Sequence, residues 1–455
     1  MKSKSRTPFL LALLCLIVAG ATFGVTMLLI NIAERKREAR LYPAKLTEVE
    51  QSEPDSKKWG ESFQNQYDAW LKTSTNYGRT KYGGSEPFQH VEENPRLKRL
   101  FAGYAFAVDY REERGHAWTI TDVKNTERTK QFKQPLTCMT CKSSQVPRKM
   151  DEYGGPAAFY KQKFAEHADE FTEPIGCADC HDAKTMNLRI SRPAFREAME
   201  ARGIDLSKAT RQEMRSYVCG QCHVEYHFKG EGKYLTFPWT NGLNFDEIER
   251  FYEEQGFTDW THAETRAKML KAQHPEFETW STGIHARSGV ACADCHMPYQ
   301  RVGSVKVTDH WIQSPMQHIN RSCQNCHRWS EAELAGRVEA IQDRTAKMLE
   351  RAELAIIALI DDIKGVMAEG ATDERLESAR QFHREAQFRW DFIAAENSMG
   401  FHSPQETLRI LGESIDLARQ GQLEVAKIRE ALHTPQPVAS TPEPTEEAAS
   451  GQSAY

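Results

Sequence analysis

Ten of the eleven cysteines in this 455-residue sequence fall into five Cys-x-x-Cys pairs, and this pattern constrains the fold more than any other feature. Four of the pairs are followed at once by a histidine. In the Cys-x-x-Cys-His pattern the cysteines attach a haem covalently and the histidine binds the iron. The pairs are Cys138 and Cys141, Cys177 and Cys180, Cys219 and Cys222, Cys292 and Cys295, and Cys323 and Cys326, and the four histidines are His181, His223, His296 and His327.

Other uses of paired cysteines fit this sequence less well. Zinc ribbons do not need a histidine directly after each second cysteine. A thioredoxin-like redox site uses one pair near a βαβ pattern, and structural disulfides rarely join cysteines only two residues apart. We therefore predict a covalently bound haem c at each pair. Because haem c is attached outside the cytoplasm, the sequence also predicts an exported, periplasmic protein.

The first motif, CMTCK at residues 138–142, has Lys142 where the histidine is expected. Only the neutral amine of a lysine binds a metal, and burial, which lowers the pKa of lysine, favours that form. On CMTCK alone two interpretations stay open. Lys142 is an iron ligand, or it is a solvated lysine beside a degenerate pair whose histidine comes from elsewhere in the chain.

The number of histidines allows every haem iron to have two protein ligands, or one iron to keep an open coordination position. Four of the sixteen histidines belong to the motifs, so twelve remain as candidates for the distal positions. An iron with two protein ligands transfers electrons, whereas catalysis needs an open coordination position. The exceptional first haem is the natural candidate for that position.

The N-terminus predicts a membrane anchor or a signal sequence over residues 1–33. An uncharged run from Thr7 to Ala33 lies between basic residues. It is longer than the ~7–15 apolar residues of a signal peptide and reaches the ~20 residues of a spanning helix. Cleavage near Ala19–Ala21 is the alternative, and we favour the uncleaved anchor.

The rest of the chain divides by composition into four parts. Long stretches rich in Ala, Glu, Arg and Leu predict a mainly α protein. The net charge of -5 does not favour binding to nucleic acid. The Pro-, Glu- and Ser-rich C-terminus predicts disorder. The predicted parts are a polar linker at 34–60, a pentahaem catalytic region at 61–330, a helical region at 331–433 and a disordered tail at 434–455.

The helical region carries an apolar seam between residues 349 and 366. Its members recur three and four residues apart, as in packed helices, and a break at Gly370 and Thr372 separates it from a second helical run through Trp390. A third run spans about Pro404 to Leu432. The seam fits packing within one chain and a subunit interface equally well. Its members are Leu349, Ala352, Ile356, Leu359, Ile363 and Val366.

Two further stretches, CGQCHVEY at 219–226 and KAQHPEFETW at 271–280, complete a recognisable set of motifs. With CMTCK ahead of four Cys-x-x-Cys-His sites, the chain resembles pentahaem cytochrome c nitrite reductase from about residue 60 to 432. The resemblance implies a multihaem cytochrome c fold wrapped around five haems. It also implies the six-electron reduction of nitrite to ammonium, with hydroxylamine or sulfite as other substrates of the same pocket.

The resemblance implies a role for each site residue. Lys142 would bind the first haem, beneath an open position lined by Arg128, Tyr226 and His274. Arg128 and His274 suit an anionic substrate, His274 would place protons as a general acid does, and Tyr226 would donate a hydrogen bond or take part in proton and radical steps. The distal ligands would be His310 for the second haem, His116 for the third, His402 for the fourth and His285 for the fifth.

A calcium ion beside the first haem is also implied. Its ligands would be the side chains of Glu225 and Gln273 and the backbone carbonyls of Tyr226 and Lys271. One carboxylate with several neutral oxygens suits a hard cation. The histidines left over, His227 among them, default to structural or surface roles.

The implied partners are a second copy of the chain and an electron donor. The C-terminal helices would form a homodimer, with the seam at 349–366 in the interface and Gln387–Phe392 packed beside it. The donor would be a membrane-associated multihaem quinol dehydrogenase or another multihaem protein. The main rival hypothesis is a non-catalytic electron carrier, which gives no reason for CMTCK or for one missing distal ligand.

Overall fold

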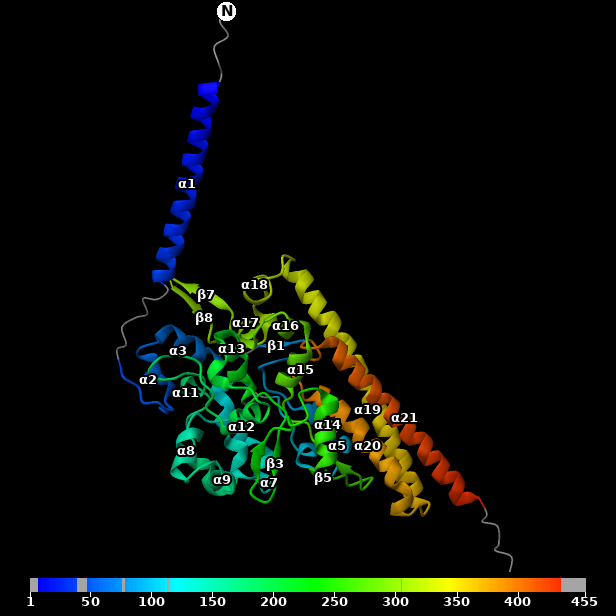
Figure 1. Ribbon diagram of the computed structural model, residues 1–455. Coiled ribbons are helices and arrows are strands. Elements are labelled where there is room, and N and C mark those ends of the chain that lie inside the picture. The colour runs from blue at the N-terminus through cyan, green and yellow to red at the C-terminus, as the bar shows by residue number, and fades with distance from the viewer. Residues whose placement is uncertain (1–6, 39–46, 76–77, 113, 304, 435–455) are drawn as a thin grey trace, which may run out of the picture.

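The computed structural model describes residues 7–38, 47–75, 78–112, 114–303 and 305–434. It consists of an N-terminal helix, a body of short elements and three long C-terminal helices (Figure 1). The helices are α1 Thr7–Glu38, α2 Ser56–Gly60, α3 Gln64–Leu71, α4 His90–Glu93, α5 Leu97–Leu100, α6 Thr119–Asn125, α7 Glu127–Gln131, α8 Val146–Glu152, α9 Pro156–Tyr160, α10 Phe164–His167, α11 Cys177–Cys180, α12 Pro193–Ala201, α13 Arg211–Gly220, α14 Phe245–Glu254, α15 Glu276–Thr282, α16 Ile284–Arg287, α17 Cys292–His296, α18 Ile319–Ser322, α19 Glu331–Ala368, α20 Asp373–Ala394 and α21 Pro404–His433.

Strands are few and short, which confirms the mainly α prediction. In the part of the chain that the structure describes, every strand pairs with one neighbour in an antiparallel hairpin. The hairpins are β1 Arg79–Thr80 with β2 Gly83–Gly84, β3 His227–Lys229 with β4 Tyr234–Thr236, β5 Trp260–Thr261 with β6 Lys268–Met269, and β7 Tyr299–Val302 with β8 Val305–Thr308.

The N-terminal helix α1 projects from the body (Figure 1). Its stretch Thr7–Arg37 is long and apolar enough to cross a membrane, and none of it is buried. At 1.5 Å per residue it exceeds the ~30 Å thickness of the hydrocarbon core of a bilayer. A signal sequence near the N-terminus has the same properties, so both predicted roles remain.

The predicted linker at 34–60 needs correction at its C-terminal end. Residues 34–38 continue α1, residues 39–46 lie outside the described part, and residues 47–60 pack on the body. Trp59 is 1% exposed and contacts Ala178 and Ala183. Its indole nitrogen donates to the carbonyl of Glu53 at 2.9 Å. The polar composition concealed this anchoring tryptophan.

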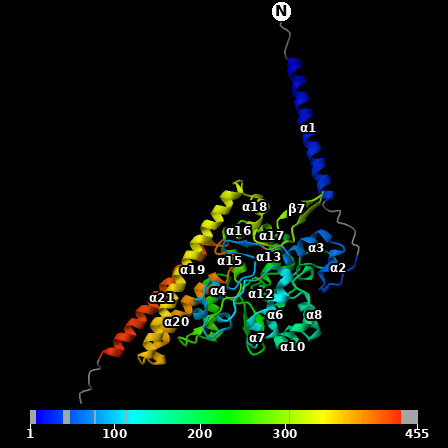
Figure 2. The same ribbon diagram turned by 180° about the vertical axis from the view of Figure 1, so that it is seen from behind.

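The three long helices pack lengthwise against one another on one side of the body (Figures 1 and 2). A capping box at Ser330 and Glu333 starts α19, and Gly370, with a φ of +97°, follows its end and allows the chain to turn into α20. At Gly421 of α21 a Cβ would lie 2.7 Å from the side chain of Leu359, so the glycine permits close approach of α19 and α21. The predicted tail beyond residue 434 lies outside the described part.

The apolar seam is buried inside the chain, so its predicted place in a subunit interface is wrong. Ala352, Ile356, Leu359, Ile363 and Val366 have no exposed surface. They share one core with side chains of α20 and α21, and Gln387–Phe392 are buried as well, apart from the half-buried Arg389. These five side chains are therefore not available to contact a second copy of the chain.

Candidate functional site

All five cysteine motifs border one cavity of about 2020 Å³. Ordinary ligand pockets reach only about 1,000 Å³. The ten motif cysteines are not joined in disulfides, and each of them lines the cavity. So do Lys142, the four motif histidines and the four predicted distal histidines. Folding thus brings side chains from residue 116 to residue 402 to the same internal space.

Short helical turns hold the motifs at the cavity wall. The first cysteine pair lies at the 3₁₀ turn Leu136–Met139, the second forms α11, the third ends α13, the fourth begins α17, and the fifth follows α18. Cysteines of different motifs are neighbours, the first motif with the third, the third with the fourth and the fourth with the fifth. The neighbouring thiols are Cys141 with Cys222, Cys219 with Cys292, and Cys295 with Cys323.

The motif histidines face the predicted distal histidines in four pairs. An iron midway between two imidazoles, with metal–nitrogen bonds of about 2 Å, separates the ring centres by about 6 Å. The observed separations agree closely with that value. They are 6.2 Å for His181 and His310, 6.4 Å for His116 and His223, 6.4 Å for His296 and His402, and 6.3 Å for His285 and His327.

Several of these imidazoles have one nitrogen held by the protein. A hydrogen bond at Nδ1 orients the ring and leaves Nε2 available for a metal, as in most metal-binding histidines. The Nδ1 partners are the carbonyls of Met186 for His181 at 3.0 Å, Gln313 for His296 at 3.1 Å and Thr308 for His310 at 2.8 Å, and the carboxylate of Glu396 for His402 at 2.5 Å.

Burial keeps most of these imidazoles neutral, which is the form that binds metal. It lowers the pKa of His310 and of His296 to about 4 and that of His223 to about 3. The His223 side chain lines the cavity and is 50% exposed. For His402, burial opposes the charged form, but the Glu396 carboxylate outweighs it and raises the pKa.

The backbone of Lys142 is held on both sides. Its N–H donates to the carbonyl of Met139 at 2.9 Å, and its own carbonyl accepts a hydrogen bond from the Thr119 hydroxyl at 2.7 Å. The side chain lines the cavity beside Cys138 and Cys141. Lys142 is therefore placed where the motif histidine lies in the other four motifs.

The three predicted catalytic residues line the same cavity. The Arg128 guanidinium lies 4.2 Å from the ring centre of Phe106, and its charge acts on the Cys138 thiol. Burial raises the pKa of Tyr226 well above its ordinary value, with further contributions from the thiols of the first motif. Tyr226 is thus a neutral phenol near that motif, able to donate a hydrogen bond. The His274 side chain is 36% exposed.

Two buried acids beside these residues escaped the sequence-based prediction. Glu396 holds His402, as described above, and Glu276 lies 4.0 Å from Nδ1 of His274 and 4.0 Å from Nδ1 of His223. Burial, and then repulsion from Glu396, raise the pKa of Glu276 to about 8. The acidic stretch after His274 hinted at Glu276, whereas nothing local in the sequence marks Glu396.

The predicted calcium ligands come from two adjacent segments. Glu225 has no exposed surface, and its carboxylate accepts hydrogen bonds from the Gln273 N–H at 2.6 Å and from the Tyr252 hydroxyl at 2.8 Å. The Gln273 side chain donates to the carbonyl of Lys271 at 3.1 Å. Three of the four predicted ligand residues therefore converge, and Tyr226, the fourth, follows Glu225 directly.

The charges around Glu225 suit a bound cation. Burial raises its pKa well above the ordinary value, and it also raises the pKa of Asp259 to about 7 and that of Glu278 to about 8. The Lys271 ammonium lies 2.8 Å from Asp391 and neutralises that acid rather than Glu225. Buried carboxylates without a compensating charge are costly, and a hard dication with oxygen ligands relieves that cost.

In the described part of the chain, no three or more His, Cys, Asp or Glu side chains come together in a group that could hold a metal ion. The predicted calcium site has a different composition, because it combines a single carboxylate with one amide and two backbone carbonyls. Such a set matches the oxygen chemistry that calcium prefers.

A mainly helical chain with five Cys-x-x-Cys motifs and four facing histidine pairs around one cavity is a multihaem c-type cytochrome. The sequence matches the cytochrome c552 family over residues 55–454, and the chain belongs to that family. It is 44% identical to cytochrome c-552 of Parabacteroides distasonis over 89% of this chain and 83% of the relative. It is 38% identical to cytochrome c-552 of Desulfotalea psychrophila over 90% of this chain and 82% of the relative.

A solved structure shares most of this architecture. The cytochrome c nitrite reductase catalytic subunit of Desulfovibrio desulfuricans, in which two calcium sites are described, superposes with a TM-score of 0.80 at 32% identity. The superposition covers 86% of this chain and 90% of that subunit. The C-terminal helices and the short-element body are therefore parts of one known fold.

Proposed function

We propose that the protein reduces nitrite to ammonium with six electrons at a lysine-ligated haem c, with electrons relayed by four bis-histidine haems c. The observation that carries the proposal is the asymmetry of the cavity. Four motifs have a facing histidine at the spacing of an iron site, whereas the first has Lys142 with Arg128, Tyr226 and His274 around it. The structural similarity to the nitrite reductase of Desulfovibrio desulfuricans supports the substrate.

The residues present fit five haems c. Ten thiols line the cavity for thioether attachment, and neutral imidazoles in facing pairs suit iron ligation. Bound haem supplies the coordination position for the substrate and the electrons for its reduction. Close approach of the cysteines of the first and third motifs, and of the third and fourth motifs, supports electron transfer between the haems that they would hold.

The roles proposed for the pocket residues follow from their charge and protonation. Arg128 supplies a permanent positive charge that holds the nitrite anion. Tyr226, kept neutral by burial, donates a hydrogen bond to a substrate oxygen. His274 delivers protons to the departing oxygens as a general acid. Retention of the partly reduced substrate by these three groups accounts for ammonium as the product.

We further propose one calcium ion held by the side chains of Glu225 and Gln273 and by the carbonyls of Tyr226 and Lys271. The ion would offset the buried negative charge around Glu225 and fix the segment that carries Tyr226 into the pocket. This proposal is supported by the raised pKa values of the surrounding acids and by the hydrogen bonds that join the two segments.

The catalytic body is proposed to lie in the periplasm, anchored by α1, as a homodimer that receives electrons from a membrane-associated multihaem quinol dehydrogenase or another multihaem donor. Extraction of membranes without detergent is expected to leave the protein in the membrane fraction. Full release with residues 1–33 missing would exclude the anchor. Sedimentation of the detergent-solubilised protein is expected at twice the 52.0 kDa chain mass, and a single-chain mass would exclude the dimer.

Ammonium yield from nitrite tests the main proposal most directly. The purified protein with a viologen donor is expected to convert nitrite to ammonium in equal amounts, while intact-protein mass shows five attached haems. Hydroxylamine and sulfite are tested in parallel. Electron transfer without ammonium would favour the carrier hypothesis, and fewer than five haems would contradict the assignment of the axial ligands.

A further inference from the structure

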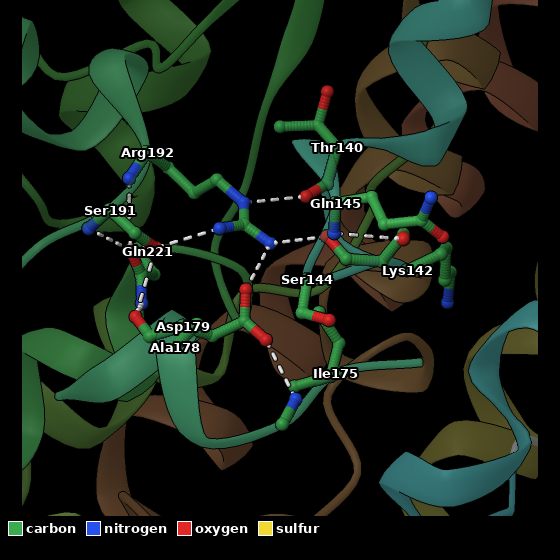
Figure 3. A network of polar contacts seen from close by, with 12 residues as sticks. Thr140, Lys142, Ser144, Gln145, Ile175, Ala178, Asp179, Ser191, Arg192 and Gln221 are labelled. Carbon is green, nitrogen blue, oxygen red and sulfur yellow. Dashed lines mark hydrogen bonds and ion pairs between the residues drawn. The ribbon is translucent and has the colours of Figure 1, made fainter. Parts of the chain in front are cut away.

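The guanidinium of Arg192 is completely buried and joins several segments of the cavity wall. Arg192 directly precedes α12 and has no exposed surface. Nε donates to the carbonyl of Thr140 at 2.7 Å, and Nη2 donates to the carbonyl of Ser143 at 2.9 Å and to the Asp179 carboxylate at 2.6 Å. Nη1 donates to the Ser191 hydroxyl at 2.7 Å. Figure 3 shows the guanidinium between Thr140 and Asp179.

The partners of this arginine belong to the first three cysteine motifs. Thr140, Asp179 and Gln221 each occupy the position directly before the second cysteine of a motif. The Gln221 side-chain oxygen accepts a hydrogen bond from the backbone N–H of Arg192 at 3.1 Å. The Gln221 side-chain nitrogen donates to the carbonyl of Asp179 at 2.9 Å. Arg192 and its neighbours thus join the three motifs by hydrogen bonds (Figure 3).

The hydrogen bonds from Arg192 to the first motif flank Lys142. The carbonyls of Thr140 and Ser143 lie on either side of Cys141 and Lys142, so Arg192 holds the backbone on both sides of these two residues. A histidine ligand is oriented through its second ring nitrogen, as His181 is by Met186. A lysine has no second nitrogen and four flexible carbons. Its direction therefore depends on how firmly its backbone is held.

Arginine suits this position better than lysine. Its planar fork presents five N–H donors in fixed directions, whereas an ammonium is a compact charge with three donors on a flexible stem. The Asp179 carboxylate, which also accepts the Gly176 N–H at 2.7 Å, balances the buried charge. Removal of one member of such a pair leaves an uncompensated buried charge.

We propose that Arg192 is a positioning residue for Lys142, fixing the backbone of the first motif against the second and third motifs. The inference deepens the proposed function and rests on it, because it requires Lys142 to bind iron. Arg192 itself contacts neither substrate nor iron in this role.

The chain offers a matched control in Arg215. This residue of α13 is 5% exposed and pairs with Asp294 at 2.8 Å, and it also donates to the Tyr299 hydroxyl at 2.5 Å. Asp294 occupies the same position in the fourth motif as Asp179 does in the second. The Arg215 pair thus joins the third and fourth motifs, and the side-chain partners Asp294 and Tyr299 lie outside the first motif.

The test compares Arg192→Lys with Arg215→Lys in the full-length protein carrying its haems. Absorption and electron paramagnetic resonance spectra separate a lysine-ligated iron from bis-histidine irons, and intact mass counts attached haems. Arg192→Lys is expected to broaden or split the signal of the lysine-ligated iron and to lower nitrite turnover about 10–100-fold, as is typical for loss of a residue that orients a metal ligand. Arg215→Lys is expected to leave that signal unchanged.

If the unsubstituted protein shows the signal of a lysine-ligated iron and Arg192→Lys leaves that signal unchanged, the role of Arg192 is overturned and the proposed function stands. Absence of any distinct iron in the unsubstituted protein would overturn the proposed function as well. Where Arg192→Lys attaches fewer than five haems, the charge-balanced Arg192→Met/Asp179→Asn variant is measured, with the same spectral change expected. Loss of the second and third haems in both variants, located by peptide mapping, would assign Arg192 to assembly of the body and contradict a specific role at Lys142.

Discussion

Replacement of Lys142 by histidine is expected to lower nitrite turnover with a viologen donor on the order of a hundredfold, or about 2.7 kcal/mol in the barrier. The axial ligand sets the electronic properties of a haem iron, and imidazole differs from an amine in its donor strength and in the second nitrogen that needs a partner. In the structure the backbone N–H of Lys142 donates to the Met139 carbonyl, and the Lys142 carbonyl accepts a hydrogen bond from the Thr119 hydroxyl. Five attached haems are expected, since both motif cysteines remain.

A suitable control is Lys208→His, the same substitution at a lysine whose side chain is 82% exposed. This variant is expected to keep the turnover and spectra of the unsubstituted protein. Equal nitrite turnover in the Lys142→His variant and the unsubstituted protein would show that the first haem is not the catalytic one.

Loss of the Glu225 carboxylate has the second large expected effect. Glu225→Gln is expected to remove one calcium ion per chain, measured by elemental analysis, and to lower nitrite turnover about 10–100-fold because the segment carrying Tyr226 loses its support. Glu225 is the one charged side chain in the predicted ligand set. The Glu225 carboxylate accepts hydrogen bonds from the Gln273 N–H and the Tyr252 hydroxyl. In the glutamine variant one carboxylate oxygen is replaced by an NH₂ group, which cannot accept a hydrogen bond from either donor.

Glu353→Gln controls for the loss of a buried carboxylate as such. Glu353 is 4% exposed and accepts hydrogen bonds from Asn94, at 2.8 Å, and Arg96 on the helical side of the molecule. This variant is expected to lose stability but to retain calcium and turnover. Full calcium content and normal turnover in Glu225→Gln would disprove the calcium site.

Composition predicted the mainly α fold, and the spacing and order of the cysteine motifs predicted the family, because covalent haem attachment requires closely spaced residues. The partners that face each other across the cavity come from distant segments, and only the resemblance to a known family pointed to them. His402, for example, lies more than a hundred residues from His296. Local chemistry alone contains no signal for such a pairing.

The seam and the linker show where sequence patterns are insufficient. A three-and-four spacing indicates a packed helix face but does not tell whether the partner is in the same chain, and Ile356 turned out to contact α20 and α21. Residues 47–60 are polar enough to suggest a linker, yet the buried Trp59 and hydrogen bonds to Gln51, Pro54 and Ser56 attach them to the body. Arg192 was not predicted either, because its role depends on three backbone segments that meet only in the fold.

The position of the ten thiols has a consequence for how the protein is made. They line one cavity, and all of them except the exposed Cys326 are at least partly buried. An attachment enzyme cannot reach these thiols once the body has closed around them. Biosynthesis must therefore follow a fixed order, in which the exported chain receives its haems while still open and completes its folding afterwards.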